Sequence, residues 1–131
     1  MQEFYNLGIT DEDIVFMIEK CNDIVSITEK EVNEKIQMLE FIGCNEKQIN
    51  NIIITNPNYL NIDNKDVIDL INKLKNLGIK NINLLFDSNP YFLNKDVFEI
   101  EDYINDRLEK KECLEDIIED IENNPYIIEE Y

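Results

Sequence analysis

Carboxylates are the chemically active groups that this sequence has in greatest number, and they are densest near its C-terminal end. The 131 residues include 29 Asp and Glu against 12 Lys and Arg, a formal net charge of −17. One short stretch holds six acidic residues: Glu112, Glu115, Asp116, Glu119, Asp120 and Glu122. Carboxylates in such a series attract a basic partner by electrostatic steering. We therefore treat these six residues, the acidic face, as a candidate partner-binding surface.

Tyrosines form the second candidate surface. Tyr59, Tyr91 and Tyr126 each follow a proline by one or two residues, so they occupy related places in a repeating pattern. Such rings either pack between neighbouring units or, where exposed beside carboxylates, bind a protein, because Tyr is enriched at interface hot spots. Both interpretations of this aromatic edge stay open at the level of sequence.

The residue types that catalysis most often needs are missing. The chain has no histidine, which removes the commonest general base and metal ligand. It also has no glycine-rich phosphate loop and no nucleophile elbow. The segment Asp63-Asn64-Lys65-Asp66 is similar to the start of a calcium loop but lacks the required glycine and closing glutamate, so helix capping explains it better. We expect no catalytic residue, no cofactor and no metal, and we predict that the protein is not an enzyme.

The spacing of glycine and proline indicates the elements that hold these groups. The three glycines lie 35 residues apart and all three prolines follow asparagine, which gives six repeat markers: Gly8, Gly43, Gly78, Pro57, Pro90 and Pro125. A period of this length is typical of stacked helical units. We predict an all-α solenoid of about three and a half helical-hairpin repeats. It forms one domain, 1–131, with units near 7–41, 42–76, 77–111 and 112–131.

Capping residues and apolar stripes place two helices in each unit. We expect Thr10 and Asn45 to cap first helices, and we expect second helices to begin at a Thr28 capping box, at Asp63 or Asn64, and at Asn94. The expected buried stripes end with Leu108 on the third unit and begin with Leu114 on the fourth. The runs 52–55 and 82–86 are also compatible with strands, but the recurring caps and following prolines favour helices.

Cysteine usage and the N-terminal residues bear on location. Cys21, Cys44 and Cys113 are odd in number and widely spaced, which favours neither a disulfide framework nor a zinc site, and we expect each to be a small buried apolar side chain. The first 24 residues hold several carboxylates and no long apolar run, so we expect no secretory signal and no membrane span. A cytoplasmic protein fits these observations best.

The markers of the second and third units resemble the repeat of the mitochondrial transcription termination factor (mTERF) family. The matching residues are Ile42-Gly43, Ile52-Ile53, Pro57, Leu60, Leu74, Leu77-Gly78, Ile79, Leu84-Leu85, Pro90 and Leu93. The first unit departs from the pattern because Asn22 stands where proline is expected, and the fourth unit is truncated. The resemblance implies an α-solenoid with two helices and a short third helical turn per repeat, and it implies nucleic-acid binding along a basic groove.

The charge argues against that use of the scaffold. Residues 1–43 carry a net −7, residues 44–78 are neutral, and residues 79–131 carry −10. Binding to phosphates relies on Lys and Arg, so a chain of this charge must first overcome long-range repulsion. The one place where a small basic patch is expected is the middle unit, which holds Lys47, Lys65, Lys73 and Lys75.

Three functions are therefore considered. We favour a protein-interaction module whose partner has a basic surface. The alternative is an acidic inhibitor, encoded by a phage or mobile element, that mimics nucleic acid and occupies a basic channel. An mTERF-like nucleic-acid binder is the third function, and the charge disfavours it. The acidity has a simpler explanation as well, since the solvated faces of a solenoid need charge for solubility.

Overall fold

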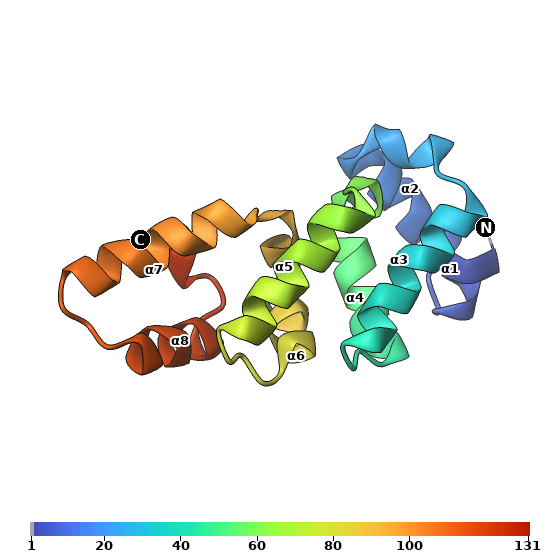
Figure 1. Ribbon diagram of the computed structural model, residues 1–131. Helices are drawn as coiled ribbons and strands as arrows, with labels where there is room; N and C mark the ends of the chain where they lie inside the picture. Colours follow the sequence, from blue (N-terminus) through green and yellow to red (C-terminus); the bar gives the residue numbers. More distant parts are fainter. Residues whose placement is uncertain (1) are drawn as a thin grey trace.

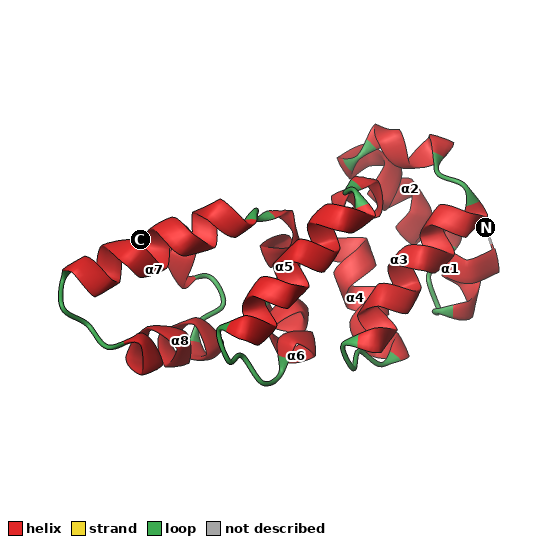
Figure 2. Ribbon diagram, in the orientation of Figure 1, coloured by secondary structure: helices red, strands yellow, loops and turns green. Residues whose placement is uncertain are grey.

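The computed structural model describes residues 2–131, and that part of the chain is helical without a strand (Figures 1 and 2). Its α-helices are α1 (Gln2–Asn6), α2 (Asp11–Lys20), α3 (Glu29–Phe41), α4 (Glu46–Thr55), α5 (Asn64–Asn76), α6 (Ile82–Ser88), α7 (Val97–Glu109), α8 (Leu114–Asn123) and α9 (Ile127–Glu130). Three short 3-10 helices complete it: η1 (Asn22–Ser26), η2 (Pro57–Asn61) and η3 (Pro90–Asn94). The predicted all-α repeat fold is confirmed, and the two apolar runs that could have been strands lie in α4 and α6.

Each of the first three units consists of a short helix, a 3-10 turn and a longer helix. The units follow one another along the molecule, with α3, α5 and α7 at the front of Figure 1 and α4 and α6 behind them. Helix α4 contacts both α2 and α6, so the short helices stack in chain order. No helix in residues 2–131 is both long and apolar enough to cross a bilayer.

The helix caps follow the sequence with two corrections. Asn45 and Gln48 form the capping box of α4, and Asp63 caps α5 by accepting from the N–H of Lys65. The expected cap at Asn94 is wrong, because α7 begins later and Asp96 accepts from the Glu99 N–H at 2.9 Å. Thr28 caps α3 as expected, but its hydroxyl donates to the Glu31 carboxylate, so the reciprocal half of the predicted box is missing.

The glycines occupy the left-handed turns that end α1, α3 and α5. Gly8, Gly43 and Gly78 have φ values of 79°, 98° and 90°. After α7 the same turn is made by Lys111, with φ 67°, a conformation that costs a residue with a Cβ about 1–2 kcal/mol. In each turn a 6→1 backbone bond closes the helix, from Ile79 N to Leu74 O in one case. A fourth left-handed turn therefore follows the three glycine turns, and its residue is a lysine.

Two buried asparagines tie the units together. The Asn56 side-chain amide donates to the carbonyl of Pro90 at 3.0 Å, and that of Asn89 donates to the carbonyl of Pro125 at 2.9 Å. Each bond joins the end of one short helix to the proline of the next unit. Asn124, in the equivalent place of the last unit, donates to Glu130 of its own unit instead. Stacking thus satisfies polar groups as well as burying apolar ones.

One apolar core runs through all the units and leaves some expected members outside. It includes Val32, Leu39, Leu74 and Ile117 among many others. The expected stripe residues Leu108 and Leu114, in the last turn of α7 and the first turn of α8, are exposed instead. Of the cysteines, Cys44 is buried, Cys21 is half-buried and Cys113 is exposed, so the prediction that all three are buried is wrong.

Candidate partner-binding surfaces

Helix α8 presents part of the acidic face as a regular row. Glu115, Glu119 and Glu122 are exposed and are spaced i, i+4 and i+7, so they line one side of the helix, with exposed Asp116 beside them. The opposite side of α8 is buried through its isoleucines. The amphipathic pattern that places apolar residues in the core therefore directs these four carboxylates outward. We call Glu115, Glu119 and Glu122 the acidic row.

The remaining members of the acidic face are engaged by Arg107. Its guanidinium donates to both carboxylate oxygens of Glu112, at 3.0 and 2.5 Å, and to Asp120 at 2.7 Å. A third contact is a bond to the Tyr103 hydroxyl at 2.6 Å. These bonds lower the pKa of Glu112 and raise that of Arg107. Glu112 also precedes α8, so it does not belong to the helical face on which the sequence reasoning placed it.

The aromatic edge is divided between two environments. Tyr59 is fully buried and its hydroxyl donates to the carbonyl of Lys35 at 2.7 Å, whereas Tyr91 and Tyr126 are 43% and 40% exposed. The reason is register: Tyr59 follows its proline by two positions and aligns with buried Phe92, while the other two tyrosines follow by one. The exposed edge therefore consists of Tyr91 and Tyr126 only.

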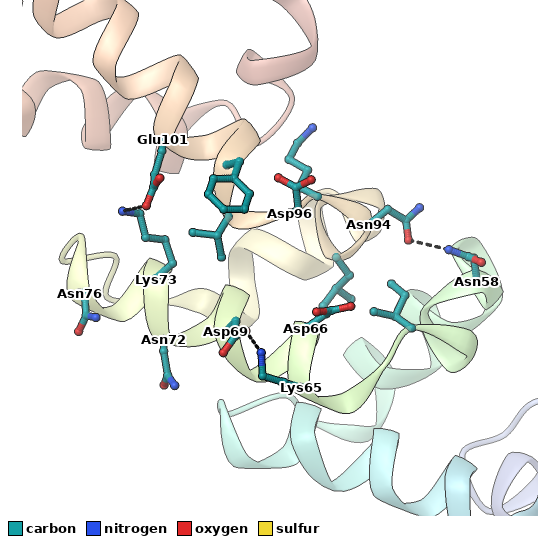
Figure 3. A pocket seen from close by; sticks show the side chains of 15 residues that line it. Asn58, Lys65, Asp66, Asp69, Asn72, Lys73, Asn76, Asn94, Asp96 and Glu101 are labelled. Carbon is teal, nitrogen blue, oxygen red and sulfur yellow. Dashed lines mark hydrogen bonds and ion pairs between the residues drawn. The ribbon is translucent and has the colours of Figure 1, made fainter.

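A polar groove of about 740 Å³ lies between α5 and α7 (Figure 3). Lys73 of α5 reaches across it to Glu101 of α7 at 3.0 Å, and Lys65 pairs with Asp69 at 3.5 Å. Its wall carries four asparagines: Asn58, Asn72, Asn76 and Asn94. Lys95, which also lines it, pairs with Glu129 at 2.8 Å. The cations of this groove are thus already neutralised by neighbouring carboxylates.

An apolar groove of about 380 Å³ lies on the other side of α5, against α3. Helix α3 contributes Glu34, Gln37, Met38 and Phe41, and α5 contributes Ile68, Ile71, Asn72 and Lys75. Both sets follow i, i+3, i+4 and i+7 spacing, so each helix turns one continuous stripe into the groove. The Phe41 ring is 79% exposed, and the Lys75 ammonium lies 4.8 Å from its centre.

The two grooves are the same feature in successive units. Adding the 35-residue period to the stripe of α3 gives Asp69, Asn72, Lys73 and Asn76, all of which line the polar groove. Met38 thus corresponds to Lys73. Ile68 corresponds to Glu101, because the third unit is two residues shorter. An apolar pair in the first groove is replaced by an ion pair in the second.

The basic patch expected in the middle unit does not form. Lys65 and Lys73 are paired with carboxylates and Lys75 lies over Phe41, which leaves Lys47 alone. The one buried lysine in the described chain, Lys35, donates to Asn64 at 2.5 Å, and burial lowers its pKa.

Sequence reasoning missed the apolar groove, although a signal was present. Met38 and Phe41 form a second apolar stripe on α3, displaced from the stripe of Val32, Ile36 and Leu39 that enters the core. A helix with one neighbour to cover needs one stripe, so a second stripe indicates a second surface.

Comparison with known proteins gives one result. A family model described as mTERF matches residues 1–111. Neither the curated proteins nor the solved structures include a match to the chain. The matched residues span the first three units and end at Lys111, the last of the left-handed turns. Because this match covers well over half of the sequence and the helix, 3-10 turn and helix recur as its repeat requires, the chain belongs to the mTERF family.

Proposed function

We propose that the chain is a non-enzymatic protein-interaction module whose partner presents a basic surface. The observation that carries this proposal is the distribution of charge. Eight of the 12 basic side chains already bind groups within the molecule: Lys20, Lys35, Lys65, Lys73, Lys75, Lys95, Arg107 and Lys110. The acidic row on α8 is exposed, so the electrostatic potential around the protein is negative and attracts cations.

Nucleic-acid binding, the use associated with this fold, is poorly supported by the same charges. A phosphate backbone binds where Lys and Arg are free to displace counterions. In the polar groove, Lys65, Lys73 and Lys95 are paired with carboxylates, which compete with a phosphate for these cations. A nucleic-acid mimic is a narrower form of the proposal, in which the basic surface is a nucleic-acid channel. The free cysteines support our further proposal that the protein works in the cytoplasm.

Fluorescence anisotropy with labelled probes tests this function. The probes are a lysine-rich peptide of about 20 residues, a DNA duplex and a single-stranded RNA, each at low salt so that surface charge is not screened. The key variant reverses the acidic row as Glu115→Lys, Glu119→Lys and Glu122→Lys. A matched control reverses three exposed carboxylates elsewhere, as Glu19→Lys, Asp23→Lys and Glu40→Lys, with the same change in net charge.

We expect the unaltered protein to bind the peptide and neither nucleic acid. Reversing the row should weaken peptide binding about tenfold, while the control weakens it about threefold or less, because close charges act more strongly than distant ones. Tight binding of duplex or single-stranded nucleic acid by the unaltered protein would overturn the proposal. Equal losses in the two variants would show that net charge acts without a specific face.

A further inference from the structure

We infer that the apolar groove between α3 and α5 is a second docking site, and that its occupant is an amphipathic, basic α-helix of a partner protein. This inference goes beyond the charge-based function, since it names another surface and another kind of contact. It stands on the groove's geometry, on its exposed apolar groups and on its charge.

The spacing of the lining residues suits the apolar side of one helix. Two helix stripes with i, i+3, i+4 and i+7 spacing face a common depression of about 380 Å³. An amphipathic helix uses the same spacing for its apolar side, so its side chains can enter between those of α3 and α5. The floor is apolar through Met38 and Ile71, and the sides are formed by Phe41 and Ile68.

The apolar groove leaves two large apolar side chains exposed. Phe41 is the most exposed large apolar side chain in residues 2–131, and Ile68 beside it is 47% exposed. In the equivalent places of the next unit the chain has Asn76 and Glu101, which are polar. Because the next unit folds with polar residues at these two positions, the fold does not require apolar residues there. Folding alone therefore does not explain Phe41 and Ile68.

Charge selects the kind of helix. The groove is lined by one cation, Lys75, which lies over the Phe41 ring, and by one anion, Glu34 of α3, which accepts from the Asn64 side-chain amide at 2.7 Å. The net charge of −17 disfavours a second copy of this chain and any acidic helix at long range. A partner helix with leucine-like residues on one side complements the apolar floor of the groove. Lys or Arg on the flanks of that helix complements the negative charge of the chain.

The test measures binding of synthetic helices to the intact chain. One peptide of about 18 residues places Leu at i, i+3, i+4 and i+7 with Lys elsewhere, and its control has the same composition in scrambled order. Binding is measured by anisotropy at salt high enough to screen the acidic row. Three variants are compared: Phe41→Ala, the pair Met38→Lys with Ile68→Glu, and Phe98→Ala. The double variant copies the ion pair Lys73–Glu101 into the apolar groove.

The expected result is tight binding of the amphipathic peptide and weak binding of its scrambled control. Phe41→Ala should weaken binding at least about tenfold, since exposed aromatic anchors dominate such interfaces. The double variant should abolish binding, while Phe98→Ala, which removes an exposed ring from the polar groove, should change it less than about twofold. Circular dichroism checks that each variant folds, and these positions are exposed or half-buried, so we expect it to.

Several results would overturn the inference. They are equal affinity for the ordered and scrambled peptides, no loss in Phe41→Ala, or preference for an otherwise identical Leu/Glu helix. Sedimentation velocity that shows a dimer abolished by Phe41→Ala would assign the groove to a second copy instead. The acidic-row variant separates this inference from the proposed function: at screening salt it should bind the amphipathic peptide as the unaltered protein does, whichever way the lysine-rich probe behaves.

Discussion

The two halves of this solenoid solve the same packing problem with different chemistry. In the first half, equivalent positions across the helices hold apolar pairs, such as Met38 and Ile68 in the apolar groove. One unit later the same positions hold Lys73 and Glu101, joined at 3.0 Å. The order of short helix, 3-10 turn and longer helix is the same in both units. The pattern of side chains, and not the repeat itself, therefore decides which surface is open to a partner and which is closed by an internal pair.

The helix-ending turns show the same change. Leu39 and Leu74 of α3 and α5 are fully buried beside the apolar residue that follows the glycine. In α7 the equivalent position is Arg107, and the residue after the turn is Glu112, which it binds. Such a turn usually carries an apolar contact between these two positions. At the end of the third unit an ion pair replaces it, and ion pairs that are part-exposed contribute less to stability than buried leucine.

The largest test of this comparison is removal of a buried leucine from the first half. Leu74→Ala leaves a cavity in the core, and we expect it to lower the free energy of unfolding by about 2–5 kcal/mol. Urea denaturation followed by circular dichroism measures the loss. Leu84→Ala, at an exposed leucine of the next helix, is the control and should cost about 0.5 kcal/mol or less. Similar losses in both variants would contradict the view that this turn depends on apolar burial.

The asparagines between units should show a smaller difference of the same kind. Asn89→Ala removes the part-buried bond to the carbonyl of Pro125 and the bond accepted from the Tyr91 N–H, so we expect a loss of about 1–3 kcal/mol. Asn124→Ala, in the last unit, removes a bond within its own unit and should cost about 0.5 kcal/mol or less. Thermal unfolding of both variants provides the measurement. If Asn124→Ala is the more damaging change, the bonds between units do not hold the stack.

The left-handed turns offer a pair of opposite substitutions. Gly78→Ala meets no atom within 4 Å of the added Cβ, so its expected cost of about 1 kcal/mol is conformational alone. Lys111→Gly relieves the same strain in the last turn, and we expect it to stabilise the protein by about 0.5–1 kcal/mol. Denaturation midpoints of the two variants should shift in opposite directions. A shift of both in one direction would mean that the φ values of the two turns do not determine their stability.

These turns also show how far sequence predicts the fold. Glycine and Asn-Pro mark the period because a positive φ and a fixed proline φ are local demands that few other residues meet. The same backbone forms at Lys111 and at Asn22, which begins η1 without a proline. The backbone bonds of the turn and of the 3-10 helix form there without the marker residue, so a rule based on glycine and proline does not detect them. The cap predicted at Asn94 is wrong for a related reason. The Asn94 side chain bonds to Asn56 of the preceding unit, a contact that local sequence does not reveal.

The candidate surfaces were predictable to a similar degree. Helical spacing correctly placed the acidic row outside, because one side of α8 had to be buried. Helical spacing did not predict that Arg107 would form ion pairs with Glu112 and Asp120, since those contacts cross the turn between α7 and α8. Spacing did not separate Tyr59, which follows its proline by two positions and is buried, from Tyr91 and Tyr126, which follow by one and are exposed.

The smallest expected effect is the pH dependence that Glu112, in the turn after α7, gives to stability. Bonds from Arg107 lower the pKa of Glu112 in the folded protein, so the ionised carboxylate is favoured by folding. A lowered folded pKa contributes stability above the ordinary pKa of Glu, about 4.3, and that contribution is lost as pH falls through the folded value.

Carboxyl NMR should therefore give a midpoint for Glu112 below the ordinary value. In Arg107→Met the midpoint should return toward it, with Lys73→Met, which removes the other cross-helix pair, as the control that leaves Glu112 unchanged. If the Glu112 midpoint does not move in Arg107→Met, the guanidinium is not what holds this carboxylate, and the contrast between an apolar first half and an ionic last turn loses its best-defined contact.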